Sequence, residues 1–432
     1  MNKKLLVLAL AAGFAAPAMA DVTISGTVNA GVNIGRSNDG SGTTSNPSTG
    51  VGADEAFQGQ YGVNGGSGQG LTSNYSNINI RSEEDIGNGN KVIFNYQVDI
   101  SNTGAGVHTA GSNALRSRNS YLGLMGGWGA LKWGSNEHVY EQYMYQSDPL
   151  DGAMGLGGNL QMLGTPGGNV FAWSNNGLAG GAGSAQFYRR TENSVWYESP
   201  DINGFTFAIA YGLPGNGGTN QQTYNGFNGA GTVNQKPTVF SAGAQYKPAD
   251  MPFFVNIAME RHNDYNGLSQ ITGAFNNGTT GSTVQTGTTN TKDTGIQLGG
   301  GVYFGDLTVY ARVERLTYKA DGVTQGFSEW ERDAFSLGAK YVVPTGYIGA
   351  QFILARDADT KTAGTERFDG KDTGATMFSL GYAHNLSKQT QALIFASFIQ
   401  NDANANYLNI GSPTNGRGAD GQSIYLGLKH SF

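Results

Sequence analysis

The sequence predicts an all-β protein whose strands close into a transmembrane antiparallel β-barrel. Between residues 22 and 34, apolar or small side chains alternate with polar ones, and the apolar set is Val22, Ile24, Gly26, Val28, Ala30, Val32 and Ile34. Successive side chains of a strand point to opposite faces, so one face here is apolar and the other polar. The pattern recurs along the chain, and no segment is left to cover the apolar faces. A barrel with lipid outside and water inside satisfies both faces.

The first twenty residues read as a secretory signal peptide. Met1-Asn2-Lys3-Lys4 is basic, an apolar run starts at Leu5, and Ala18-Met19-Ala20 ends it. This order is typical of a cleaved signal, and the run is shorter than the roughly 20 residues that a membrane helix needs. We expect residues 1–20 to be removed and residues 21–432 to form the barrel.

Composition narrows the function classes. The chain has no cysteine, which excludes cysteine nucleophiles and zinc or iron–sulfur sites built on cysteine. The net charge is −6, and it becomes −8 without Lys3 and Lys4, which argues against nucleic acid as a partner. Glycine accounts for 68 of 432 residues, against a typical share of ~7%, and the excess falls mainly in loops and turns.

Alternation predicts sixteen strands. They are expected to start near Val22, Asn77, Lys91, Ser117, Gly129, Asn193, Phe205, Thr238, Pro252, Asp293, Leu307, Arg332, Gly346, Ala375, Thr390 and Gln422. Their connections differ in length between the two ends. Short turns lie at 86–90, 199–204, 248–250 and 343–345, whereas long loops lie near 36–75, 135–190, 214–237, 264–292 and 402–421. A sixteen-strand barrel leaves an aqueous channel, whereas ~8 strands would be filled by side chains.

Several short segments, in this order, resemble those of the general trimeric porins of Gram-negative bacteria, of the beta- and gammaproteobacterial type. The segments are Asp21–Thr27, Glu84–Gly89, Arg118–Leu124, Asn193–Pro200, Leu386–Lys388 and Tyr425–Phe432. The resemblance covers essentially the whole chain after residue 20.

This resemblance implies an outer-membrane location, with short periplasmic turns and long extracellular loops. It further implies a homotrimer and a third loop, here about 135–190, folded into the lumen. The implied function is passive diffusion of ions and small hydrophilic solutes through a water-filled channel, with no enzymatic activity and no cofactor. Outer-membrane lipid and lipopolysaccharide would surround the barrel. Leu426, Leu428 and Phe432 of the last strand resemble the signal read by the barrel-assembly machinery.

Parity identifies the charges that should face the lumen, because an Arg or Lys facing lipid at the midplane would cost ~2–4 kcal/mol. The inward set on the strands is Arg81, Glu83, Asp99, Lys132, Arg312, Glu314 and Lys340. The third loop adds Glu141, Asp148 and Asp151. A constriction selects ions by opposed charges at close range. Arg81 and Lys132 are the preferred basic candidates, and Glu141 and Asp148 the preferred acidic ones.

Three positions depart from this scheme. Gly134-Ser135 stands where many relatives carry Gly-Arg, and Trp196 takes an inward position that is often basic in the family, so inherited anion preference is in question. Arg118 shares parity with outward Leu122 and Leu124. It must either lie beyond the membrane edge or follow a β-bulge.

Other functions find less support in the sequence. The five histidines show no metal spacing, and no nucleophile–base–acid set stands out, which disfavours a barrel enzyme. Two channel-compatible alternatives stay open: a surface adhesin or receptor that uses the long loops, and a substrate-specific channel. For the latter, a sugar path could be formed by Tyr140, Tyr143, Tyr145, Phe171 and Trp173, unless these rings pack the loop against the wall.

Overall fold

The protein is described by a computed structural model. It describes residues 21–38, 66–100, 116–151, 158–167, 185–188, 190–213, 237–265, 267–268, 271, 288, 290–364, 369–407 and 418–432. The predicted signal peptide and most of the long loops lie outside these ranges. Within the described residues, no helix has the length and apolar character needed to cross a membrane.

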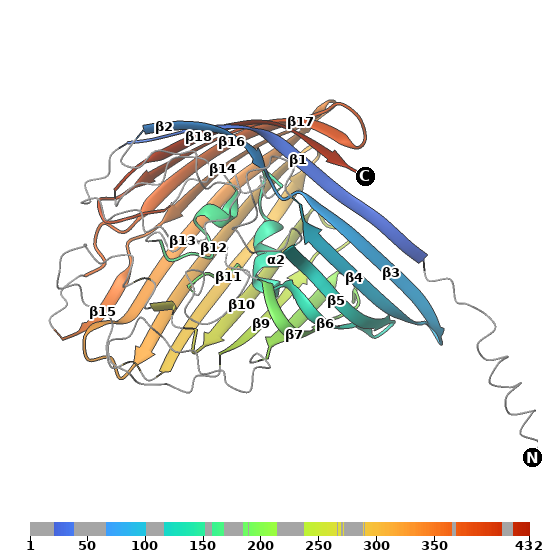
Figure 1. The fold of residues 1–432 in the computed structure, drawn as a ribbon, viewed down its shortest axis with the longest axis horizontal. Coiled ribbons are helices and arrows are strands. Elements are labelled where there is room, and N and C mark those ends of the chain that lie inside the picture. Colours follow the sequence, from blue (N-terminus) through green and yellow to red (C-terminus); the bar gives the residue numbers. More distant parts are fainter. Residues whose placement is uncertain are drawn as a thin grey trace, which may run out of the picture.

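Antiparallel strands make up the wall (Figure 1). They are β1 (Asp21–Ser37), β2 (Gly66–Ser73), β3 (Asn77–Gly87), β4 (Asn90–Asp99), β5 (Arg116–Gly126), β6 (Gly129–Glu137), β7 (Arg190–Glu198), β8 (Phe205–Gly212), β9 (Thr238–Tyr246), β10 (Phe253–Asn263), β11 (Asn290–Phe304), β12 (Leu307–Asp321), β13 (Gly326–Val343), β14 (Gly346–Ala355), β15 (Asp359–Ala363), β16 (Ala375–Asn385), β17 (Thr390–Asn401) and β18 (Gly421–Ser431). Helix α2 (Val139–Tyr145) and the short 3₁₀ turn η2 (Asn159–Gln161) follow β6.

The barrel closes between its first and last strands. β1 pairs with β18 from Thr27↔Ser431 to Ser37↔Gly421. The Gly26 amide donates to the Phe432 carbonyl at 2.9 Å, and the Phe432 amide donates to the Gly26 carbonyl at 3.0 Å. Closure removes both free sheet edges, as a membrane interior requires.

The eighteen strands occupy sixteen places in the wall, which confirms the predicted barrel. β2 and β3 both pair with β1, one with its second half and one with its first. In the same way, β13 pairs with both β14 and β15. Each of these two pairs is therefore one wall strand with a local interruption.

Most predicted strand starts lie within three residues of the observed ones, and the larger differences have a common cause. β13 begins at Gly326 instead of near Arg332, β2 lies within the loop predicted near 36–75, and β15 was not predicted as a separate strand. The first part of β13 presents Glu329 and Glu331 on the outer face, where they pair with basic side chains. β2 has Leu71 as its only large apolar residue. Neither segment shows the apolar alternation of a lipid-facing strand.

Alternation along the strands divides lipid from lumen. On β18, Ile424, Leu426 and Leu428 are 44–54% exposed, whereas Tyr425 and Ser423 are buried at 1% and 4%. These buried side chains point into the barrel, and Tyr425 packs there with Leu150 of the chain that follows β6. Figure 1 shows α2 enclosed by the strands, and its contacts are with β8, β9, β10 and β11.

Candidate pore constriction

The chain after β6 crosses the lumen and seats on glycines of the opposite wall. α2 lies against Gly243 of β9, where a Cβ would come within 2.8 Å of Val139. Further along, Pro149 lies over Gly338 and Gly349, where a Cβ would come within 2.7 Å of its Cγ and 2.5 Å of its carbonyl oxygen. Glycines on the inner face therefore let this loop approach the wall backbone closely.

Arg312 of β12 is the first anchor of the loop. It is 1% exposed, its Nε donates to Ser147 Oγ at 2.6 Å, and it also donates to the Tyr143 carbonyl. Gln297 Oε1 and Asn256 Oδ1 accept at 2.7 and 3.0 Å and hold the guanidinium from the wall side. The inward charge predicted at Arg312 thus lies beneath the loop and binds it.

Glu314 and Arg332 form a second anchor. Glu314 Oε2 accepts from the Tyr140 hydroxyl and the Gly164 amide, both at 2.8 Å. Its other oxygen accepts from Arg332 at 2.7 Å, and Arg332 also donates to the Met162 carbonyl at 3.0 Å. One buried ion pair therefore holds two separate parts of the loop, one at Tyr140 and one at residues 162–164.

Asp148 organises the loop internally. One carboxylate oxygen accepts from the Leu150 amide and the other from the Asn159 amide, each at 2.9 Å. Burial raises the pKa of Asp148 to about 6, although both amide hydrogen bonds oppose the shift. Asp148 joins the loop tip to η2.

Glu141 of α2 is buried at 2% and accepts from the Tyr145 hydroxyl at 3.2 Å. Burial, and then the nearby charge of Glu137, raise its pKa to about 8. At neutral pH this side chain is therefore largely protonated and carries little charge.

An ion-pair cluster holds the root of the loop. It includes Arg118, whose parity in the sequence matched outward-facing residues. Arg118 pairs with Asp99 at 2.6 Å and Glu137 at 3.5 Å, and Arg190 also pairs with Glu137. The β4–β5 register shifts between Tyr96 and Val98, so Arg118 turns inward although Leu122 faces outward. Of the two alternatives for Arg118, the bulge is the one observed.

A buried carboxylate lies between two histidines beside this root. Glu260 of β10 contacts His138 Nδ1 at 3.0 Å and His262 Nε2 at 2.7 Å, and all three side chains are fully buried. His138 directly precedes α2, so Glu260 fixes the start of the helix to the wall. Nothing in the sequence pattern linked these residues.

The other predicted basic residues, Lys340, Lys132 and Arg81, are less buried than Arg312. Lys340 pairs with Asp151 at 2.7 and 2.8 Å, and its ammonium lies 4.2 Å from the centre of the Tyr347 ring. Lys132 pairs with Glu198 at 2.6 Å. Arg81 is exposed and donates to Asn95 Oδ1 at 3.1 Å.

The predicted residues therefore fall into separate groups. The structure brings Asp151 to Lys340, and it places Glu141, Asp148, Arg312 and Glu314 in or under the loop. Arg81, Lys132 and the Glu83–Lys91 pair, which is 2.8 Å apart, lie on the β3–β7 part of the wall. Asp99 belongs to the root cluster. Leu426, Leu428 and Phe432 are exposed on the outer face.

Sequence reasoning missed Arg332, and it missed the glycine seats. Arg332 stood at the predicted start of its strand and shares parity with inward Ala334 and Ser336, so the parity rule could have identified it as an inward charge. Glycine seats give no pattern, since they acquire meaning only from the loop above them. Tyr140 and Tyr143 are buried at 0% and 7%, whereas Phe171 and Trp173 lie outside the described residues.

The closed sixteen-place barrel with an apolar outer face and a polar, loop-narrowed interior defines an outer-membrane diffusion channel. Comparison with known proteins gives the same answer. The model of the Gram-negative porin family matches residues 7–404, so the chain belongs to that family. The protein is an outer-membrane porin, and it forms a channel for passive diffusion of ions and small hydrophilic solutes.

Individual relatives are similar over different lengths. An outer membrane porin protein of Bordetella pertussis is 23% identical over the full length of both chains. The major outer membrane protein P.IB of Neisseria gonorrhoeae is 30% identical over 230 residues, which is 52% of each chain. Among solved structures, an anion-selective porin from Comamonas acidovorans matches 96% of this chain and 100% of its own, with a TM-score of 0.63 and 20% identity. At that identity the match shows the fold.

Proposed function

We propose that residues 135–190 form the constriction of this channel and that Asp151 and Lys340 are its principal charged pair. The observation that carries the proposal is the path of the loop, which is anchored at its root by Glu137, beneath its middle by Arg312 and at its tip by Gly338 and Gly349. The Asp151 and Lys340 side chains are 46% and 21% exposed, so both charges meet the water of the lumen. Opposed charges at this range create a field across the path of the ions.

We further propose a weak preference for anions. Three lumen cations, Lys340, Lys132 and Lys91, are each compensated by a carboxylate within 2.8 Å. Arg81 and Lys429, on the inner faces of β3 and β18, have no carboxylate partner among the described side chains. The acids of the loop are either buried, as Asp148 is, or paired, as Asp151 is.

Single-channel recording in a planar bilayer tests both proposals. Purified, folded protein should give stable ohmic current steps. In a KCl gradient, the sign of the reversal potential should indicate that chloride permeates somewhat better than potassium. A reversal potential indicating cation preference would contradict the charge assignment while leaving the channel intact. If a correctly folded barrel showed no conductance, the proposal that the constriction leaves the pore open would be contradicted.

A homotrimer is the proposed assembly. A solved structure of OmpT from Vibrio cholerae in a trimer form is similar in fold, with a TM-score of 0.54 at 12% identity. The outer face carries many exposed apolar side chains, and contacts between copies would cover part of them. Conductance steps in groups of three, together with a trimeric mass in mild detergent, are the expected results; a monomeric mass would contradict this assembly.

Lipopolysaccharide is the proposed lipid partner. A belt of basic and acidic side chains lies on the outer face of β12, β13 and β15, toward the end of the barrel with long loops. It includes the Arg315–Asp333, Lys319–Glu329 and Lys361–Glu329 pairs. Arg315 and Asp333 of this belt also line a groove whose apolar part is formed by Ile296, Leu298, Val313, Phe335 and Leu354. Phosphates of the outer leaflet would meet the basic side chains, so lipopolysaccharide should raise the unfolding temperature more in the wild type than in an Arg315→Gln/Lys319→Gln/Lys361→Gln variant.

The last strand is the proposed signal for the barrel-assembly machinery. Leu426, Leu428 and Phe432 face outward and are 46–54% exposed, so a partner could read them before the barrel closes. Phe432→Ala should reduce the amount of barrel assembled in cells while leaving refolding in detergent nearly unchanged. Equal loss in both settings would indicate a purely structural role.

The mature chain is proposed to start at Asp21.

A further inference from the structure

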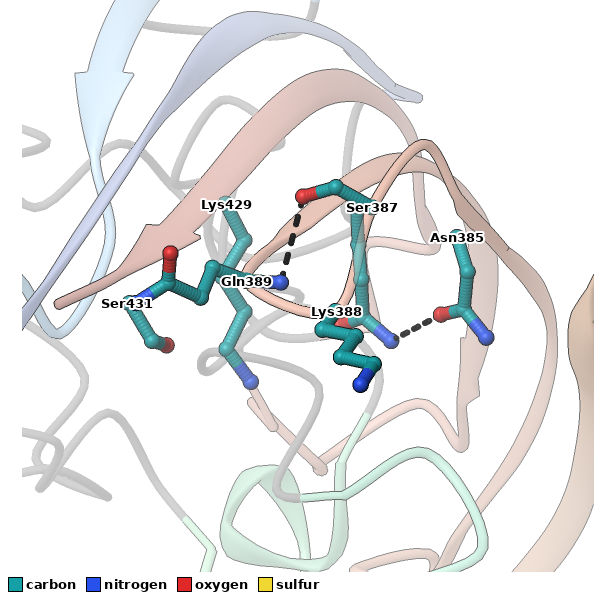
Figure 2. A pocket seen from close by; sticks show the side chains of 7 residues that line it. Asn385, Ser387, Lys388, Gln389, Lys429 and Ser431 are labelled. Carbon is teal, nitrogen blue, oxygen red and sulfur yellow. Dashed lines mark hydrogen bonds between the residues drawn. The ribbon is translucent and has the colours of Figure 1, made fainter.

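A second polar site lies inside the barrel at the end with short turns, and one of its residues, Lys429, is close enough to Asp151 and Lys340 to interact with them electrostatically. A cavity of about 230 Å³ is lined by Asn385, Ser387, Lys388, Gln389, Gln391, Lys429 and Ser431 (Figure 2). These residues come from the end of β16, the start of β17, the turn between them and the end of β18. The cavity therefore belongs to the periplasmic mouth of the channel.

Every side chain of the lining can donate a hydrogen bond, and none of them carries a carboxylate. The lining has two ammonium groups, three amide side chains and two hydroxyls. Figure 2 shows Lys388 and Lys429 extending toward the same side of the cavity. Neither ammonium has a carboxylate within ion-pair distance among the residues that the structure describes. An ammonium offers three donors and no acceptor, so this cavity is chemically suited to an anion.

The neighbouring hydrogen bonds keep the lining in place without consuming the lysines. Gln391 donates to Asn385 Oδ1 at 2.9 Å, and Ser387 Oγ accepts from the amides of Gln389 and Thr390 at 3.2 and 3.0 Å. The turn is thus ordered by its own Ser387. The amide groups are positioned beside the lysines before any ligand arrives.

The rest of this end of the barrel is not comparably basic. Glu84 and Asp85 lie at the β3–β4 turn, Asp201 at the β7–β8 turn, and Asp306 at the β11–β12 turn. Lys247 at the β9–β10 connection is followed by Asp250. Lys388 is therefore the one cation in a described short turn that has no acid in the same turn. The nearest acid of the loop, Asp151, is held by Lys340.

We propose that this cavity is a binding site for small oxyanions, phosphate or carboxylate in type, at the periplasmic mouth. Lys388 and Lys429 supply the charge, and Gln391 and Asn385 supply directional hydrogen bonds. Charge-assisted hydrogen bonds to oxyanions are roughly twice as strong as neutral ones, so the two lysines dominate affinity. The site would retain multivalent anions at one end of the channel, which a fixed charge at the constriction alone does not do.

Equilibrium binding tests the site independently of conduction. Inorganic pyrophosphate is titrated calorimetrically into folded protein in detergent, at about 0.1 M KCl, where charges are screened beyond ~10 Å. We expect saturable binding that weakens about tenfold in Lys388→Gln/Lys429→Gln. Lys247→Gln is the matched control, since it removes a lysine from another periplasmic connection of the same barrel, and it should bind like the wild type.

A bilayer measurement supplies the sidedness. Pyrophosphate added to one face of the wild-type channel should reduce KCl conductance more than when it is added to the other face, and the double variant should lose this asymmetry. Unchanged binding in Lys388→Gln/Lys429→Gln, or equal loss in Lys247→Gln, would overturn the site. Neither result would bear on whether the protein is an open porin, because the KCl conductance without pyrophosphate reports that separately.

Discussion

Asp151, at the tip of the lumen loop, accepts two contacts from the Lys340 ammonium of β13, at 2.7 and 2.8 Å. The two residues are 189 positions apart in sequence. Lys340 is itself fixed by the face of the Tyr347 ring. Because both charges remain partly exposed, this pair joins the loop to the wall at a point where passing ions can sense it.

Neutralising either member of this pair should change ion selectivity in opposite directions. Asp151→Asn leaves Lys340 uncompensated and should favour anions, whereas Lys340→Gln should favour cations. The permeability ratio should change roughly two- to fivefold, since a unit charge at 4 Å is worth about 1 kcal/mol in water. Reversal potentials in a KCl gradient measure this ratio. Glu329→Gln, on the outer face, is the control, and a similar shift in that variant would contradict the assignment.

Arg312 should contribute to loop anchorage and not to selectivity. Arg312→Met leaves the Tyr143 carbonyl, Ser147, Gln297 and Asn256 without their shared donor. We expect the free energy of unfolding to fall by about 3–5 kcal/mol, as when one member of a buried charged network is removed. The open-channel current should also fluctuate more. Arg315→Met in the same strand faces outward with a 55% exposed side chain and should cost less than about 1 kcal/mol. Equal destabilisation by the two variants would show that Arg312 does not anchor the loop.

The lumen loop should be held more firmly in acid. A carboxyl group whose pKa is raised on folding stabilises the folded state fully below its ordinary pKa, and that contribution is lost as the pH rises through the folded-state value. For Asp148 the window runs from about pH 4 to about 6, and for Glu141 it runs from above pH 4 to about 8. Chemical unfolding in detergent between pH 4 and 9 should show stability falling across these ranges.

Glu141→Gln tests the upper part of that pH dependence. Glutamine keeps the size of the side chain and its bond to Tyr145 but does not titrate. The decline in stability between pH 6 and 8 should largely disappear, while below pH 6, where both groups contribute, only the part that comes from Asp148 should persist. An unchanged profile above pH 6 would mean that another group titrates there.

Gly338 should limit where the loop tip can lie. A Cβ at this position would come within 2.7 Å of Pro149 Cγ, so Gly338→Val forces the tip away from the wall. Overpacking of this kind costs about 1–3 kcal/mol, and the displaced tip should change single-channel conductance. Gly127→Ala is the control, because a Cβ there meets nothing within 4 Å. Wild-type conductance in Gly338→Val would argue against a tip seated on this glycine.

Much of the wall could be predicted because strand parity is a local property. Phe335 and Leu337 face outward and Ser336 faces inward, as their alternation requires. The prediction weakened where a strand left the apolar zone, as at Gly326, because charged outer faces carry no such alternation. It also left two alternatives at Arg118, because a bulge reverses parity without a clear signature in the residue types.

The sequence by itself determined the closed barrel, its apolar outer face and the inward direction of residues such as Arg312, Glu314 and Lys340. Those features follow from the two-residue period of a strand and from the cost of placing charge in lipid. Only the tertiary structure decided which inward charges meet water. Arg312 is covered by Ser147, 165 positions earlier, whereas Lys340 meets Asp151 at an open part of the lumen. The path of a loop across a barrel depends on contacts distant in sequence, such as the seat of Pro149 on Gly338, and no local pattern encodes them.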